Sequence, residues 1–382
     1  MRILTIDIGT GTQDILLFDS RLDIENGYKL VMPSPTLLVS KRIHEATRRR
    51  QPLLLSGVTM GGGPCAWAAE AHLRAGLPVY ATPEAARSFD DDLDTVKRMG
   101  ITVLGEDEAR SLPATVRRME MRDLDLDPIR KAFSEFGVRM DSLSAVAVAV
   151  FDHGNAPPGI SDRKFRFDYL DERIHGNGCL SAFAYLAQDI PPIMTRMAAV
   201  NRSAQGIDCL LVVMDTAPAA VLGATFDPLV SHRERLLVAN IGNFHTLAFR
   251  LSGGSIDGVF EHHTGLLDRP RLERYLGELA GGSITREEVY NDHGHGALVY
   301  GGGKLDLDEG EFGVAVTGPR RRMMEGSALR PYFCAPFGDM MLSGNIGLIS
   351  AVGDLLPNAR DEIRAALKSA GETPRPPWET DA

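Results

Sequence analysis

The feature that most constrains the fold is a strand, a polar turn and a second strand that occur twice along the chain. The first copy covers residues 3–19, where ILTIDI and DILLFD flank a turn rich in Gly and Thr. The second copy covers residues 236–251, where LLVANIG leads through a short polar turn into HTLAFRL. Aligning Asp7 with Asn240 puts the copies 240 − 7 = 233 residues apart. Each copy precedes a further strand and a helix, so the repeat predicts an α/β protein with two related halves.

The chain of 382 residues is long enough for two or three domains with substantial cores. We expect a first domain at residues 1–150, with an inserted subdomain at about 82–142, and a second domain at 151–372 that opens with a helical segment. The Pro-rich, charged residues 373–382 are expected to form a flexible tail. Between the two copies, the pattern predicts one irregular stretch and then two helices, at residues 155–175, 178–188 and 193–202.

Charge and hydropathy exclude several classes of function. With 41 Lys and Arg against 51 Asp and Glu, the net charge is −10, which disfavours binding to nucleic acid or to an anionic membrane surface. The longest apolar stretch, 143–151, is far shorter than the roughly 20 residues of a membrane-spanning helix. Asp7 would interrupt the apolar region of a signal peptide, so we interpret the N-terminal segment as a strand and expect a cytoplasmic protein.

The four cysteines do not form a recognisable metal-binding motif. They are separated by 114, 30 and 125 residues (179 − 65, 209 − 179 and 334 − 209) and are Cys65, Cys179, Cys209 and Cys334. We expect reduced and mostly buried thiols. The spacing excludes a CxxC zinc site and a closely spaced iron–sulfur motif.

The turn of the first copy has the chemistry of a phosphate site. Backbone NH groups at glycines can point toward an anion, and hydroxyl and amide side chains add donors. The expected phosphate-binding residues are Gly9, Thr10, Gly11, Thr12 and Gln13. Asp7, at the end of the first strand, would lie beside the phosphates, where its charge requires a divalent cation, so it predicts a Mg²⁺ ligand.

The second copy repeats this arrangement. Its expected binding residues are Asn240, Gly242, Asn243, His245 and Thr246. One such hairpin is weak evidence, because ordinary β-turns also favour Gly, Asn and Thr. Two hairpins in the same strand context can clamp one polyphosphate, so the agreement of the copies is the stronger signal.

The motif DIGTGTQD at residues 7–14 resembles the first phosphate motif of the superfamily of sugar kinases, acetate kinases, actin and Hsp70-type ATPases, and NIGNFHT at 240–246 resembles the second. The resemblance implies two actin-like (ribonuclease H-like) domains that close on ATP and Mg²⁺ in an interdomain cleft. It also places Gly318, in the segment 316–319, near the adenosine. Asn240 stands where an acid is usual, and Pro319 stands where a second glycine is frequent.

The whole chain resembles a bacterial and archaeal family of which some members are labelled pyruvate formate-lyase activating enzyme-like. A radical activase of the iron–sulfur type needs three clustered thiolates. The cysteine spacing supplies none, so this resemblance implies a fold and no activity.

Two acids end apolar strands, at the edge where open parallel sheets place their ligands. Asp152 follows SAVAVAVF and precedes His153, and no helix start follows it to explain the acid. We expect Asp152 to orient an acceptor hydroxyl, with His153 as the rival for proton transfer. Asp215 is better explained as the N-cap of a helix that begins near Ala217.

Seven of the ten histidines lie in polar turns or strand ends, where sites are commonly built. Each one alone is best explained by a hydrogen bond to a neighbour. If several converge beside carboxylates, they would hold a transition metal; the candidates are His153, His175, His245, His262, His263, His293 and His295.

The leading functional hypothesis is an ATP-dependent phosphotransferase or ATPase that binds nucleotide and Mg²⁺ and acts on a small-molecule acceptor. One alternative is a metal-dependent hydrolase that uses a His/Asp cluster. Another is a non-catalytic, nucleotide-binding regulatory protein, which Asn240 favours. The sequence leaves open both the acceptor and assembly into a homo-oligomer.

Overall fold

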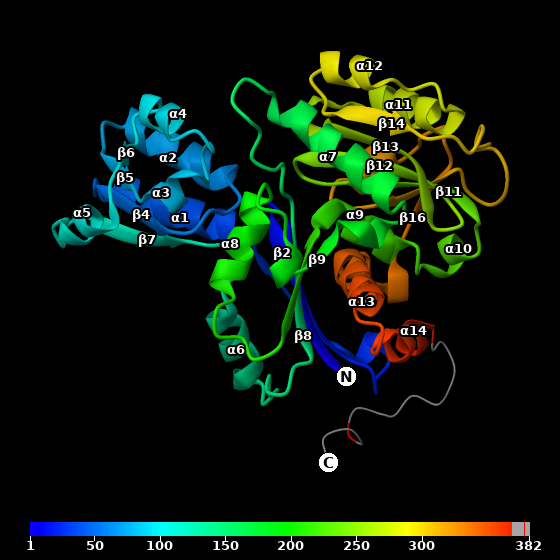
Figure 1. Cartoon of the computed structure of the whole chain (residues 1–382), viewed down its shortest axis with the longest axis horizontal. Helices are drawn as coiled ribbons and strands as arrows, with labels where there is room; N and C mark the ends of the chain where they lie inside the picture. Colours follow the sequence, from blue (N-terminus) through cyan, green and yellow to red (C-terminus); the bar gives the residue numbers. More distant parts are fainter. Residues whose placement is uncertain (369–377, 379–382) are drawn as a thin grey trace.

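A computed structural model describes residues 1–368 and Trp378. It contains two six-stranded sheets and one four-stranded sheet, with helices packed on their faces (Figure 1). The expected tail at 373–382 lies, apart from Trp378, outside the described residues. Among the described helices, none has both the length and the apolar run that crossing a bilayer requires. The cytoplasmic location stays a prediction.

The first sheet is built around the N-terminal hairpin. Its strands, in spatial order, are β3 (Tyr28–Pro33), β2 (Thr12–Asp19), β1 (Arg2–Ile8), β8 (Ala145–Val150), β10 (Leu210–Asp215) and β9 (Ala184–Leu186). β1 is antiparallel to β2 and parallel to β8, and β10 is parallel to β8. β8 is buried along its whole length, as its continuous apolar run predicts for a central parallel strand.

The second sheet repeats this order. Its strands are β14 (Gly296–Val299), β13 (Ser255–His263), β12 (His245–Ser252), β11 (Arg235–Ile241), β15 (Val314–Thr317) and β16 (Pro331–Phe333). β11 is antiparallel to β12 and parallel to β15, as β1 is to β2 and β8. Apart from the edge strands β9 and β14, both sheets therefore place their third, second and first strands side by side and then add two parallel strands, β8 and β10 in the first sheet and β15 and β16 in the second. The two related α/β halves expected from the repeat are confirmed, and their topology is that of the actin-like fold which the resemblance implies.

A smaller parallel sheet lies between β3 and β8 in the sequence and projects to the left in Figure 1. Its strands are β6 (Thr102–Val103), β5 (Val79–Ala81), β4 (Leu53–Gly57) and β7 (Arg117–Met121). The accompanying helices are α1 (Pro35–Arg48), α2 (Pro64–Arg74), α3 (Pro83–Ala86), α4 (Leu93–Arg98) and α5 (Glu106–Ser111), and α6 (Leu126–Glu135) leads to β8. This sheet has a core of its own. The expected domain boundaries, and the inserted subdomain at about 82–142, stay predictions.

The segment between β8 and β10 differs from the sequence-based expectation. Helix α7 (Asp162–Gly176) occupies most of the stretch expected to be irregular, and residues 180–189 form 3₁₀ turns and the edge strand β9 instead of a helix. α7 buries Arg166 together with Phe167 and Leu170. Because a charged residue lies on its core-facing side, the apolar periodicity that would predict a helix is interrupted. The expected helix at 193–202 is present as α8 (Thr195–Ser203).

Two equivalent helices cross between the halves. α9 (Thr216–Ala224) follows β10, and α13 (Ser343–Leu355) follows β16 and packs closely against α9. A Cβ atom on Gly223 would overlap the carbonyl oxygen of Ser343, and one on Gly347 would overlap that of Ala219. The backbones therefore touch directly, which only glycine permits at these two positions.

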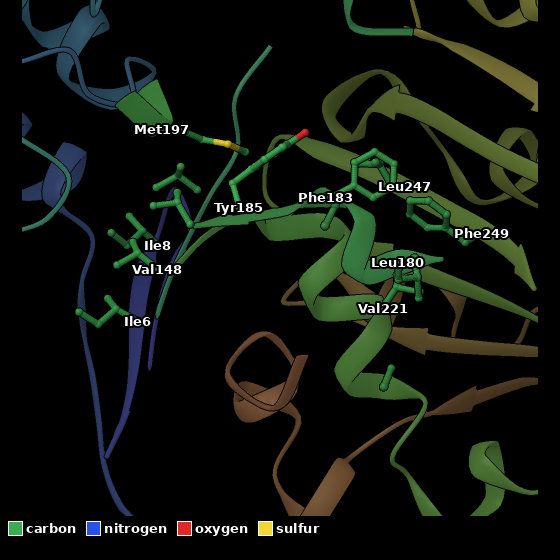
Figure 2. Close-up of a cluster of buried hydrophobic side chains, with 14 of the residues drawn as sticks. Ile6, Ile8, Val148, Leu180, Phe183, Tyr185, Met197, Val221, Leu247 and Phe249 are labelled. Carbon is green, nitrogen blue, oxygen red and sulfur yellow. The ribbon is translucent and has the colours of Figure 1, made fainter. Parts of the chain in front are cut away.

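One apolar core continues from the first half into the second. Figure 2 shows Ile6, Ile8 and Val148 at one end of this cluster and Leu247 and Phe249 of β12 at the other. Phe183 and Val221 are members of the same cluster. The remaining described helices are α10 (Pro228–Ser231), α11 (Arg269–Gly281), α12 (Arg286–Asn291) and α14 (Arg360–Lys368).

Candidate functional site

A cavity of about 340 Å³ lies between the two hairpins. The expected site residues that line it are Asp7, Gly9, Thr10, Gly11, Thr12, Asp152, His153, Asn240, Gly242, Asn243, His245 and Gly318. Gln13 and Thr246 do not line it. The Gln13 amide donates to the carbonyl oxygen of Pro33 at 3.1 Å, and the Thr246 hydroxyl bonds that of Thr264 at 2.9 Å.

The two hairpin turns close in the same way. The NH of Gly9 donates to the carbonyl oxygen of Thr12 at 2.9 Å, and the NH of Gly242 donates to that of His245 at the same distance. The turns also approach each other, because a Cβ atom on Gly11 would lie 3.0 Å from the Asn243 amide nitrogen. Both hairpins therefore border one shared space.

Two carboxyl groups of the first hairpin line this space. Asp7 on β1 and Asp14 on β2 are directly paired across the hairpin, so their side chains lie on the same face of the sheet. Burial, opposed by the Thr216 hydrogen bond, raises the pKa of Asp7 to about 6. Burial, together with the charge of Asp7, raises the pKa of Asp14 to about 8. Within the described part of the chain, Asp14 Oδ1 is buried without a hydrogen-bond partner.

The first turns of α9 and α13 also border the cavity. Thr216 donates its hydroxyl to Asp7 Oδ1 at 2.6 Å, and Gly344 packs so closely on Asp7 that a Cβ atom would overlap the carboxylate. The Ser343 hydroxyl lies 3.1 Å from that of Thr317. Helix N-termini carry partial positive charge, so both helices make this end of the cavity favourable for anions.

Gly318 connects β15 to the cavity wall. Its φ of +96° is in the region that favours glycine, and a Cβ atom there would lie 2.5 Å from the carbonyl oxygen of Ile241. Pro319 follows it along the lining. A side chain at Gly318, the residue expected near the adenosine, would therefore clash with the backbone of β11.

Asp152 has structural partners that the sequence did not suggest. Its carboxylate accepts hydrogen bonds at 2.9 Å from the NH of Gly154 and from that of Met197, in the first turn of α8. Burial raises the pKa of Asp152, and the two NH donors oppose that rise. The expectation that no helix explains this acid is wrong, because its carboxylate accepts from the NH of Met197 in α8, a helix that begins 195 − 152 = 43 residues later.

The smaller sheet closes one side of the cavity. Arg196 of α8 pairs with Asp123 through a 2.6 Å contact, and Asp123 also accepts from the NH of Gly61 at 3.2 Å. The exposed Trp67 of α2 meets Phe244 edge to face, with ring centroids 5.3 Å apart. The Asp123 contacts join the loop 61–63 to α8, and the Trp67–Phe244 contact joins α2 to the second hairpin.

A buried arginine joins the two halves behind the cavity. Arg166 of α7 is fully buried and forms ion pairs with Asp215, at the end of β10, and with Glu261 of β13. It also donates to the carbonyl oxygen of Asp152 at 3.0 Å. Burial raises the pKa of Glu261 to about 7, although the charge of Arg166 opposes the rise. Asp215 also accepts from the NH of Ala217 at 3.2 Å, so the expected N-cap is present.

Three of the seven candidate histidines converge. One ligand nitrogen from each of His153, His245 and His295 lies within 4.8 Å of the other two. Burial, reinforced by the charge of Arg166, lowers the pKa of His153 to about 3, and burial also lowers the pKa of His245 and of His295. The ring of His263 lies beside this group, with its centroid 4.6 Å from that of His295 and the two rings tilted by 59°.

The other three candidates lie apart from this group. His262 is buried, and its ring nitrogens lie 3.1 Å from the carbonyl oxygen of His263 and 3.0 Å from that of Asp292, so its N–H has an acceptor in either tautomer. His175 is exposed at the end of α7, 3.1 Å from Asp171. His293 occupies a turn with a φ of +66°.

The sequence reasoning missed several residues of the site. Asp14 was part of the quoted motif, and its partnership with Asp7 follows from counting outward from the hairpin turn. Arg166, Glu261 and the Arg196–Asp123 pair had no local signal, because each depends on contacts between distant segments.

Solved structures with a similar fold share little sequence with this chain. The ethanolamine utilization protein EutJ from Carboxydothermus hydrogenoformans is 12% identical over 91% of this chain and 89% of its own, with a TM-score of 0.32. The activator of 2-hydroxyisocaproyl-CoA dehydratase from Clostridium difficile, with bound ADPNP, is 10% identical over 98% of this chain and 99% of its own, with a TM-score of 0.35. A chain of the PilM–PilN type IV pilus biogenesis complex is 12% identical over 94% of this chain and 99% of its own, with a TM-score of 0.38. Likeness at this level carries no argument about function, and no curated protein matches the chain.

A family model matches residues 60–323, which is more than half of the chain. The chain therefore belongs to the DUF1786 family, described as "Putative pyruvate format-lyase activating enzyme". Among the described residues, the only group of three or more possible metal ligands is the histidine trio, and it contains no cysteine. The thiolate cluster of an iron–sulfur activase is thus absent from the described part of this chain.

Proposed function

We propose that this protein binds a Mg²⁺–nucleoside triphosphate, ATP above all, between its two hairpins and acts as an ATPase or phosphotransferase. The observation that carries the proposal is the meeting of two equivalent Gly-containing turns across one cavity beside paired acids. A volume of about 340 Å³ suits a small-molecule ligand of nucleotide size.

The donor set fits Mg²⁺. Asp7 and Asp14 supply carboxylate oxygens, the ligands that Mg²⁺ prefers, and Asp14 Oδ1 lacks any partner among the described residues. Two buried acids beside each other are unfavourable without a cation. A bound Mg²⁺ would be held by these two carboxylates and would neutralise their charge beside the phosphates.

The phosphates would be held by backbone and hydroxyl donors. The turns at 9–12 and 242–245 provide NH groups, and the first turns of α9 and α13 add positive potential. Adenosine would lie toward Gly318, as the family resemblance implies.

The acceptor side is proposed to lie near Asp152 and His153, because both line the cavity. Asp152 already accepts two backbone hydrogen bonds, so we assign it a positioning role: it fixes the loop that carries His153 to the start of α8. The acceptor would be a small molecule with a hydroxyl or another nucleophilic group.

Calorimetric titration with ATP tests the proposal, with and without Mg²⁺. Asp14→Asn keeps the side-chain volume and should weaken Mg²⁺-dependent binding by at least about 10-fold, or 1.4 kcal/mol. Asp94→Asn is the matched control, because Asp94 is 72% exposed on α4. Absence of binding at millimolar ATP and Mg²⁺ would refute the proposal.

Phosphate release then separates catalysis from regulation. Turnover, alone or with a panel of hydroxylated acceptors, supports the ATPase or phosphotransferase. Tight nucleotide binding without turnover on any acceptor favours the non-catalytic regulatory alternative. Asn240, which stands where an acid is usual, is the sequence feature that supports this alternative.

A further inference from the structure

We infer that His153, His245 and His295 form a site for one divalent transition-metal ion of the zinc type, at the inner end of the cavity. The inference is independent of nucleotide binding. It rests on the convergence of three imidazoles from three separate elements: the loop after β8, the start of β12 and the residue before β14.

The first argument is the hydrogen bonding of His295. This side chain is fully buried, and neither ring nitrogen has a hydrogen-bond partner within the described residues. Leaving buried polar atoms unpaired is costly, so native proteins rarely do it without a reason. His262, equally buried on β13, has a carbonyl oxygen within 3.1 Å of each ring nitrogen, so its N–H finds an acceptor in either tautomer. The chain thus satisfies a buried histidine that serves the fold, and the bare nitrogens of His295 indicate a ligand.

The second argument is the surroundings of the three rings. Glu261 Oε1 is buried, unpaired among the described residues, and 3.7 Å from His295 Nε2. A small shift would let Nε2–H donate to this carboxylate and leave Nδ1 for the metal, the carboxylate–histidine arrangement common around metal ligands. Neutral imidazole suits Zn²⁺ and similar ions.

The two guanidinium groups near the rings, Arg166 and Arg196, are each paired with carboxyl groups: Arg166 with Asp215 and Glu261, and Arg196 with Asp123. Their positive charge, which adds to burial in lowering the pKa of His153 and by itself opposes a cation, is therefore offset by these partners.

The coordination would be open on one side. His153 and His245 line the cavity whereas His295 lies behind it, so a fourth position would face the space between the hairpins. Three protein ligands with an open position are typical of zinc sites that bind water or a substrate oxygen. His263, whose ring is 5.1 Å from that of His245 and 4.6 Å from that of His295, is the one nearby imidazole that could close it.

The test is metal titration of chelator-treated, dialysed full-length protein. With Zn²⁺, followed by competition with a chromophoric chelator, we expect one equivalent to bind; with Co²⁺, we expect visible absorption bands of a low-symmetry site. His153→Ala, His245→Ala and His295→Ala should each weaken Zn²⁺ binding by at least about 100-fold, more than the loss expected from a supporting partner. His175→Ala, at an exposed histidine 66% accessible, should bind like the wild type.

Circular dichroism of the metal-free variants shows whether each folds. If His295→Ala does not fold, the Zn²⁺ affinities of His153→Ala and His245→Ala test the site instead. His263→Ala separates the coordination sets: unchanged Zn²⁺ affinity supports three ligands with an open position, and a loss like that of His153→Ala would overturn the open site. Asp14→Asn should still bind one equivalent of Zn²⁺. If the wild-type protein binds Zn²⁺ but no nucleotide, only the proposed function is refuted. Zn²⁺ binding that is absent in the wild type, or unchanged in all three variants, overturns the inference.

Discussion

Replacing Arg166 with methionine should destabilise the protein more than any surface change on the same helix. The guanidinium is fully buried and is paired with Asp215 and Glu261, one from each half. Methionine fills a similar volume but leaves two buried carboxyl groups without their cation. Removing one partner of a buried ion pair typically costs about 3–5 kcal/mol, a large share of the roughly 5–15 kcal/mol that stabilises a typical domain.

The measurement is urea unfolding of metal-free protein at one fixed pH, followed by far-ultraviolet circular dichroism and by tryptophan fluorescence. Trp67 contacts Phe244, so its emission also reports whether the smaller sheet stays against the second hairpin. Lys164→Met is the matched control on α7, because the Lys164 pair with Asp168 is exposed and should contribute at most about 0.5 kcal/mol.

Arg166→Lys should give an intermediate loss, because it keeps the charge but not the planar fork that reaches both acids. Adding Glu261→Gln to Arg166→Met should recover part of the stability, because one uncompensated buried charge disappears. If Arg166→Met shifts the free energy of unfolding by less than about 1 kcal/mol, or no more than Lys164→Met does, the buried ion pairs do not couple the halves as argued.

Three further predictions concern packing and burial. Gly347→Ala should destabilise the protein by about 1–3 kcal/mol, because its Cβ would overlap the carbonyl oxygen of Ala219 at the α9–α13 crossing. Gly277→Ala in α11, where no described atom lies within 4 Å of the added carbon, should instead be neutral or stabilising by up to about 1 kcal/mol in the same thermal melts. With a disulfide reagent at pH 8, Cys179 should react within minutes and Cys65 only after unfolding, because Cys65 is buried and burial raises its thiol pKa to about 11. Equal rates for the two thiols would contradict the burial.

The architecture was predictable from sequence because it depends on local patterns that occur twice. The residues of each hairpin are consecutive, and a short polar turn fixes which residues face each other. Asp7 and Asp14, opposite each other across the first hairpin, could have been paired by the same counting. The helix α7 was missed because Arg166 interrupts its apolar face, and only the distant acids Asp215 and Glu261 explain that residue.

The histidine site was predictable only as a set of candidates. His153, His245 and His295 lie in three elements that the two sheets bring together, and no spacing in the sequence distinguishes them from His175 or His293. The role of Asp152 was hidden for the same reason, because α8, whose Met197 NH donates to its carboxylate, begins 43 residues later (195 − 152).

The position of the smaller sheet has a consequence for how the chain folds. Leu4 of β1 pairs with Val146 of β8, 146 − 4 = 142 residues away, whereas the equivalent pair in the second half, Leu237 and Val314, is 314 − 237 = 77 residues apart. The difference in loop-closure entropy is only about 0.5 kcal/mol, so the longer interval scarcely affects stability. It affects timing: during synthesis one edge of β1 stays unpaired until β8 has emerged. The intervening sheet has a core of its own, so it can fold first and bring the two strands together.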